Sequence, residues 1–194
     1  MTQPHLRRRR ASDLDGCVAG LAEVHRVDGY PMNWPADPHR WLREPHAARA
    51  WVAVDAEAAI VGHVAVHRLP SPVNGEPPAR PTAEVARLFV IPAARGLALG
   101  SALLARARQW AGARGTDLVL EVTSADAAAV ALYERTGWRC TGTSTAPWTA
   151  PDGGPVALRH YMLRGDAAPA IAARRRASWA AASRSSGGSS TSAS

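Results

Sequence analysis

The residues from Pro92 to Ser101 have the types and the spacing of an anion-binding turn. An apolar run stops at the proline, and the segment ARGLALGS then leads into an amphipathic helical pattern. A helix that starts here leaves backbone amides without carbonyl partners and directs its positive dipole end at the turn. Gly96 and Gly100 allow a ligand to approach the main chain, and Arg95 adds a charged donor. The pattern indicates a phosphate site; the alternative is an ordinary strand–turn–helix joint with two packing glycines.

Two common nucleotide-binding motifs are absent from this turn. No Lys-Ser or Lys-Thr pair follows it, which excludes a P-loop that hydrolyses nucleotides. The GxGxxG fingerprint of dinucleotide-binding folds is also missing. What remains is a site at which a pyrophosphate is held and not cleaved.

The segment RLFVIPAARGLALGSALL, residues 87–104, resembles the acetyl-CoA signature of the GNAT superfamily of N-acetyltransferases. That signature consists of a strand, a proline, Arg/Gln-x-x-Gly-x-Gly/Ala and a helix. Arg95 and Gly100 fill its outer positions, and Ala98 stands where the middle glycine is usual. Because backbone amides do the binding, we expect this small departure to weaken the fit at most.

A second segment, DAAAVALYERTGW, residues 126–138, resembles the second motif of the same superfamily. Asp126 replaces the usual asparagine and Trp138 replaces the usual phenylalanine. The residues that match this motif are Ala129, Leu132, Tyr133, Glu134 and Gly137.

The resemblance implies acetyl-CoA as co-substrate, with no metal, and it implies where the coenzyme binds. The strand with Leu88, Phe89 and Val90 would splay from its neighbour, so that its freed backbone groups bond the pantetheine arm and polarise the thioester carbonyl. Asp126 would contact the coenzyme or cap its own helix. The pyrophosphate would lie on the residues Arg95, Gly96, Leu97, Ala98, Leu99, Gly100 and Ser101.

Two residues are the candidate catalytic groups. The resemblance places Tyr133 near the thioester sulfur, where its phenol could protonate the leaving thiolate; the alternative is a tyrosine packed in the core. An amine acceptor must lose a proton, and Glu84 is the candidate base, directly or through water. A solvated carboxylate at the strand end is the competing interpretation, and Glu121 is a second candidate base.

The acceptor is expected to bind between the first helix pair and the loop before the last strand. Asp28 could attract a cationic amine, while Tyr30, Trp34 and Trp148 could form the walls of the site; each aromatic side chain could instead belong to the core. No His or Cys spacing predicts a metal site.

The leading hypothesis is an N-acetyltransferase, in which a primary amine attacks acetyl-CoA directly in a ternary complex. The acceptor could be a small molecule or a peptide or protein amine, and the chain could form a homodimer. One alternative is a non-catalytic acyl-CoA sensor. Another is acetylation of a charged tRNA, with the arginine-rich ends of the chain as electrostatic arms.

The charge distribution argues against a nucleic-acid-binding face. The net charge is +7, but eight of the 23 basic residues lie in residues 7–10 and 174–184, which leaves 15 bases against 16 acids. No apolar run is long enough to span a membrane. Cys17 and Cys140 are expected to be reduced and buried, which favours a cytoplasmic protein.

The elements that must position these residues follow from the hydrophobic patterns. We expect one domain over residues 4–165, followed by an Ala/Arg/Ser/Gly-rich disordered tail over residues 166–194. The fold class is α+β, a mixed and mostly antiparallel twisted sheet with helices on both faces, as the GNAT-like acyl-CoA N-acyltransferase fold requires. Ser12 is expected to cap the first helix, with Asp15 completing a capping box. The expected strands are 5–10, 48–54, 59–69, 83–91, 117–122, 138–142 and 155–163. One helix is expected directly after Ser12, and further helices are expected at 39–44, 97–113 and 126–137. Loops are expected at 71–81 and 144–154.

Overall fold

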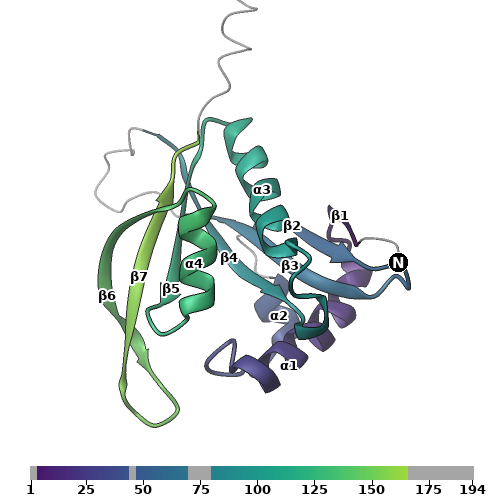
Figure 1. Cartoon of the computed structure of the whole chain (residues 1–194), viewed down its shortest axis with the longest axis horizontal. Coiled ribbons are helices and arrows are strands. Elements are labelled where there is room, and N and C mark those ends of the chain that lie inside the picture. The colour runs from purple at the N-terminus through teal and green to yellow at the C-terminus, as the bar shows by residue number, and fades with distance from the viewer. Residues whose placement is uncertain (1–3, 44–46, 70–79, 166–194) are drawn as a thin grey trace, which may run out of the picture.

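A computed structural model describes residues 4–43, 47–69 and 80–165, which form a seven-stranded sheet covered by helices (Figure 1). The strand order is β1-β2-β3-β4-β5-β7-β6, and every neighbouring pair is antiparallel except β4 and β5. The predicted mixed, mostly antiparallel sheet is therefore confirmed. The strands are β1 His5–Arg8, β2 Ala47–Val54, β3 Ile60–Arg68, β4 Thr82–Val90, β5 Asp117–Thr123, β6 Arg139–Thr149 and β7 Pro155–Leu163.

Helices cover both faces of the sheet, as predicted. One apolar cluster joins α1 and α2 to β2 and β4, with Leu21 and Leu42 fully buried. The opposite cluster joins α3 and α4 to the other face, with Leu103 and Tyr161 at its centre. The α-helices are α1 Leu14–Asp28, α2 Pro38–Arg43, α3 Leu99–Gly112 and α4 Ala127–Arg135, and two 3-10 helices are η1 Ala11–Asp13 and η2 Pro92–Ala94.

The predicted cap of the first helix is wrong by one residue. Ser12 lies inside η1, and Asp13 is the N-cap residue of α1. The Asp13 carboxylate accepts a bond from the backbone amide of Arg10 and two bonds, of 2.7 and 2.8 Å, from the guanidinium of Arg7. These bonds lower the pKa of Asp13 below its ordinary value. The sequence pattern placed the cap within one residue but could not show the contacts of Asp13 with Arg7 and Arg10.

The N-terminal arginines belong to the fold and do not form a free arm. Arg9 is partly buried, and its guanidinium donates to the carbonyl of Leu42 at 2.6 Å and lies 3.2 Å from Nε2 of His63. His63 is fully buried, and its Nδ1 lies 2.8 Å from the carbonyl oxygen of Arg87. Since that carbonyl can only accept, Nδ1 carries the proton and Nε2 accepts from Arg9. The side chain of His63 therefore links Arg9, directly after β1, to Arg87 of β4.

This buried histidine predicts a pH dependence of stability. Burial lowers the pKa of His63 to about 3. The unfolded chain takes up this proton near pH 6.5 and the folded chain does not, so stability falls as the pH falls from about 6.5 towards 3. Between pH 7 and pH 5 the free energy of unfolding should drop by about 2 kcal/mol through this group. Urea unfolding of His63→Asn, whose amide does not titrate, should show a correspondingly smaller drop; an equal drop in both proteins would contradict the assignment.

Other expected boundaries need correction. α3 begins at Leu99 and not at 97, because Ala98 adopts a left-handed conformation. The strand β6 continues through most of the expected loop 144–154, since it pairs with β7 as far as Thr149. Cys17 is buried as expected, but Cys140 is exposed. Residue 44, most of the loop 71–81 and the tail 166–194 lie outside the described residues.

Candidate functional site

An opening between β4 and β5 lies at the centre of the candidate site. The two strands pair in parallel at only three positions, the last of which is Glu84 opposite Val119. Beyond that point, in the part of the chain that the structure describes, β4 pairs with β3 and β5 pairs with β7. The two strands diverge (Figure 1), as the resemblance implied.

A β-bulge in β4 turns backbone groups into this opening. Arg87 has a φ of 56°, and the register with β3 shifts beside it. The amide of Ile91 donates to Val61 of β3, at 3.0 Å. Because backbone groups alternate along a strand, those of Val90 face away from β3, towards the opening. Phe89, in contrast, is buried against α1 and stacks on His63.

The turn between β4 and α3 presents backbone amides at a helix N-terminus. Gly96 has a φ of 78° and Ala98 a φ of 56°, so both residues are left-handed and the chain turns sharply. The first bond of α3 runs from Ala102 to Ala98, which leaves the amides of Leu99, Gly100 and Ser101 without an intrahelical acceptor. The amide of Arg95 is not part of this group, because it donates to Pro92 at 3.2 Å. Of Arg95, the guanidinium is then the donor that could serve the predicted site.

The two glycines of the turn have different physical roles. A Cβ on Gly96 would meet nothing within 4 Å, so glycine is favoured there by its positive φ. A Cβ on Gly100 would lie 3.1 Å from Cδ2 of Leu132. Gly100 therefore allows α4 to pack closely against the start of α3, which holds the turn against the helix that carries Tyr133.

The guanidinium of Arg95, in the turn before α3, is paired with a carboxylate that is predicted to bind the acceptor. Arg95 makes a bidentate ion pair with Asp28, at the end of α1. From the sequence, Asp28 is expected at the acceptor and Arg95 at the coenzyme. The ion pair connects the two regions, and a diphosphate on the turn would compete with Asp28 for this guanidinium.

Tyr133 approaches the opening from the α4 side of the sheet. It is 8% exposed and packs edge-on to Trp138 and beside Tyr161. Burial raises the pKa of Tyr133 well above its ordinary value, and the Tyr30 hydroxyl and the Asp126 carboxylate lie within electrostatic range. The phenol is thus protonated at neutral pH. The Asp126 side chain caps α4 by accepting from the amide of Ala129 at 2.9 Å, which agrees with the capping alternative for this residue.

Glu84 and Tyr30 approach the opening from the α1 side. The Glu84 carboxylate is about one-third exposed, and its Oε2 lies 3.7 Å from Nδ1 of the buried His67. Burial raises the pKa of Tyr30 to about 12, with Arg87, Asp126 and Glu84 as its charged neighbours. Tyr133, the candidate acid, and Glu84, the candidate base, therefore approach the opening from opposite faces of the sheet. The contact of His67 with Glu84 could not be predicted from the residue spacing, because it depends on the β3–β4 register.

Two of the aromatic side chains predicted to line the acceptor site are exposed. Trp34 and Trp148 are 39% and 42% exposed. The amide of Asn33 donates to the carbonyl of Thr149 at 3.4 Å, so the segment after α1 crosses the β6–β7 hairpin. Trp148 lies on β6 and not on the expected loop.

Three further polar side chains meet on strands β5, β7 and β6. His160 lies between Glu121 and Ser144, with both ring nitrogens in contact with oxygen atoms. Sequence reasoning found Glu121 alone, because the trio exists only through the pairing of three strands.

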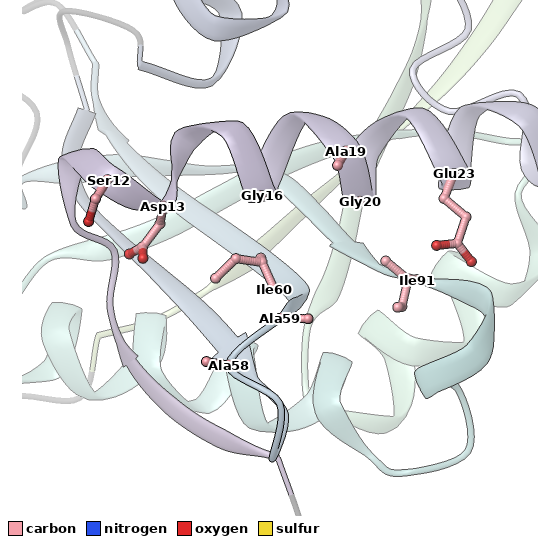
Figure 2. A pocket seen from close by; sticks show the side chains of 10 residues that line it. All are labelled: Ser12, Asp13, Gly16, Ala19, Gly20, Glu23, Ala58, Ala59, Ile60 and Ile91. Carbon is pink, nitrogen blue, oxygen red and sulfur yellow. The ribbon is translucent and has the colours of Figure 1, made fainter.

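A separate hollow of about 360 Å³ lies along α1, between this helix and the β2–β3 turn (Figure 2). Gly16 and Gly20 form its helical wall, and the carboxylate of Glu23 lies towards one end. None of the predicted site residues lines it. Among the described residues no group of three or more His, Cys, Asp or Glu could hold a metal ion, and no described helix has the length and hydropathy to cross a membrane.

Comparison with known structures shows the fold. An N-acetyltransferase from Staphylococcus aureus Mu50 matches with a TM-score of 0.68 at 20% identity, over 84% of this chain and 99% of that one. The ribosomal-protein-S18-alanine N-acetyltransferase from Escherichia coli matches with a TM-score of 0.66 at 18% identity, over 85% and 96%. A phosphinothricin acetyltransferase from Sinorhizobium meliloti, in complex with AcCoA, matches with a TM-score of 0.66 at 18% identity, over 84% and 89%.

The sequence itself places the chain in a family. No curated protein matches it at the sequence level. The profile of the acetyltransferase (GNAT) family matches residues 14–138, which include the turn between β4 and α3, the opening in the sheet and Tyr133. The chain belongs to the acetyltransferase (GNAT) family.

Proposed function

We propose that this protein transfers an acetyl group from acetyl-CoA to a primary amine, which attacks the thioester directly. The observation that carries the proposal is the opening between β4 and β5, which lies among a turn with three amides that lack intrahelical acceptors, a protonated phenol and a carboxylate. Membership of the acetyltransferase family supports it, as do structural neighbours that act on a protein alanine and on phosphinothricin.

Coenzyme binding is assigned to the main chain. The amides of Leu99, Gly100 and Ser101 face the region where the helix dipole favours an anion. The groups of Val90 that face away from β3 can bond an extended pantetheine arm as a further strand would. Acetyl-CoA supplies the activated acyl group; the chain supplies its orientation.

In this proposal two side chains transfer protons, one as a base and one as an acid. The Glu84 carboxylate, supported by His67, accepts the proton that an ammonium acceptor must lose. Tyr133 holds a proton that a leaving thiolate can take, because burial keeps the phenol neutral. The acceptor approaches past Tyr30, Trp34 and Trp148, since α4 and α3 cover the other face.

Release of free thiol from acetyl-CoA, measured against a panel of small amines, amino acids, polyamines and peptide N-termini, tests the proposal. We expect amine-dependent thiol release with at least one class. CoA binding without thiol release across the whole panel would instead support the acyl-CoA sensor.

A further inference from the structure

A nucleophile, a base and a carboxylate lie in line on the sheet surface. Ser144 Oγ is 2.7 Å from Nε2 of His160, and Nδ1 of the same ring is 3.2 Å from Oε1 of Glu121. We propose that these three side chains form a second reactive centre, in which Ser144 attacks the carbonyl carbon of short acyl esters or thioesters. The arrangement is that of an activated serine nucleophile, recognised by geometry and not by sequence order.

The two polar contacts of His160 favour one tautomer. The Glu121 carboxylate can only accept, so its ion-pair contact of 3.2 Å with Nδ1 favours a proton on that nitrogen. Nε2 then presents its lone pair to the hydroxyl of Ser144, which donates. The serine proton is therefore directed at a base that is free to take it, as nucleophilic attack requires.

The three residues are positioned by paired strands and not by loops. Glu121 and His160 are direct partners across β5 and β7, and Ser144 lies on β6, the next strand. The Thr141 hydroxyl donates to the carbonyl of His160 at 3.3 Å, beside the irregularity in the β6–β7 ladder. Side chains on paired strands hold their geometry better than side chains on loops.

The centre is accessible to a substrate. The side chains of His160 and Glu121 are 31% and 50% exposed, and Ser144 is exposed. Gly142 pairs with His160, and a Cβ there would meet nothing within 4 Å, so there is open space beside the ring. A small acyl group can approach the hydroxyl from this side.

The centre lies on the opposite face of the sheet from Tyr133. Leu120 and Tyr161 pack in the cluster beneath α3 and α4, together with Tyr133. Since side chains alternate along a strand, Glu121 and His160 point to the other face. The acid proposed for acetyl transfer is thus not a member of the trio. Glu121 is also the second candidate base for acetyl transfer, so the hydrolysis is measured without coenzyme and amine and is assigned through Ser144 and His160.

The reaction balances as a hydrolysis. Ser144 Oγ bonds to the acyl carbon while its proton moves to Nε2 of His160; the bond to the alkoxide or thiolate then breaks, and that group leaves with the proton. Water attacks the acyl-serine, gives a proton to His160 and releases the carboxylic acid, with Ser144 restored. Glu121 acts as a positioning residue, because it orients the imidazole and stabilises its charged form.

The test uses p-nitrophenyl acetate as the ester and S-phenyl thioacetate as the thioester, with no coenzyme present. The full-length protein should hydrolyse at least one of them, and a fluorophosphonate probe should label Ser144, as located by mass spectrometry. Ser144→Ala and His160→Gln should lower kcat by about 100-fold or more. Glu121→Gln should lower kcat with KM unchanged, a change that loss of surface structure alone would not give.

Ser12→Ala is the matched control, since Ser12 is also an exposed serine but lies on η1, away from the strands that carry the trio. This variant should hydrolyse and label as the wild type does. Absence of labelling, labelling at another residue, or wild-type hydrolysis by Ser144→Ala would overturn the proposal. None of these outcomes depends on acetyl transfer to an amine, so a failure here leaves the proposed function intact.

Discussion

Tyr133→Phe should reduce amine acetylation by about 100-fold or more while CoA binds as tightly as to the wild type. The variant keeps the ring that packs against Trp138 and Tyr161 and loses only the hydroxyl. Because burial raises the pKa of this phenol, the wild-type group is protonated throughout the neutral range and can supply a proton to a thiolate. Steady-state thiol release and calorimetric titration with CoA give the two quantities.

Tyr161→Phe is the control for loss of a buried hydroxyl. Tyr161 packs beside Tyr133, and its hydroxyl donates to Glu134 at 2.9 Å, so this variant should lose stability of about 1 kcal/mol and keep its turnover. Wild-type turnover by Tyr133→Phe with every accepted amine would show that another group protonates the thiolate.

Glu84→Gln should lower kcat for amine acetylation by about 100-fold. The amide keeps the shape of the carboxylate beside His67 but cannot accept the proton of an ammonium acceptor. The loss should become smaller as the assay pH rises, since more of the acceptor amine is then already deprotonated. Thiol release by the variant and the wild type over a pH series measures this difference.

Glu57→Gln removes the same charge from the exposed β2–β3 turn and should leave the rate unchanged. If Glu84→Gln showed a reduced rate with no recovery at high pH, the carboxylate would have a structural role only. If the rate stayed at the wild-type level, Glu121 would become the leading candidate for the base.

The local features of the site could be predicted because each depends on a short segment. The turn at Gly96 and the amides without intrahelical acceptors at the start of α3 follow from a proline, a glycine and a helical pattern within ten residues or so. The element order followed from hydrophobic periodicity in the same way. The cap at Asp13 escaped prediction because Arg7, on a different element, selects it over Ser12.

The contacts that depend on strand register could not be predicted from spacing alone. His67 meets Glu84 across β3 and β4, and His160 meets Glu121 across β7 and β5. A shift of one residue would turn each side chain to the other face. The extension of β6 over the expected loop has the same cause, since only its pairing with β7 as far as Thr149 determines its length.

The pair of Asp28 with Arg95 is a second kind of contact that sequence could not reveal. Its partners lie at the end of α1 and in the turn before α3, and each had been assigned a different ligand. The packing of α1 against β4, through Leu21 and Phe89, brings them together.

The central claim is that the turn between β4 and α3 binds the diphosphate of CoA. Its most direct test is calorimetric titration of the folded protein with CoA and, separately, with pantetheine, which has the thiol arm but no diphosphate. Unpartnered amides at the N-terminus of α3 should make CoA bind at least about 100-fold more tightly than pantetheine, and more weakly as salt is raised. Equal affinities for the two ligands, or no heat with CoA, would contradict the assignment of this turn to the coenzyme.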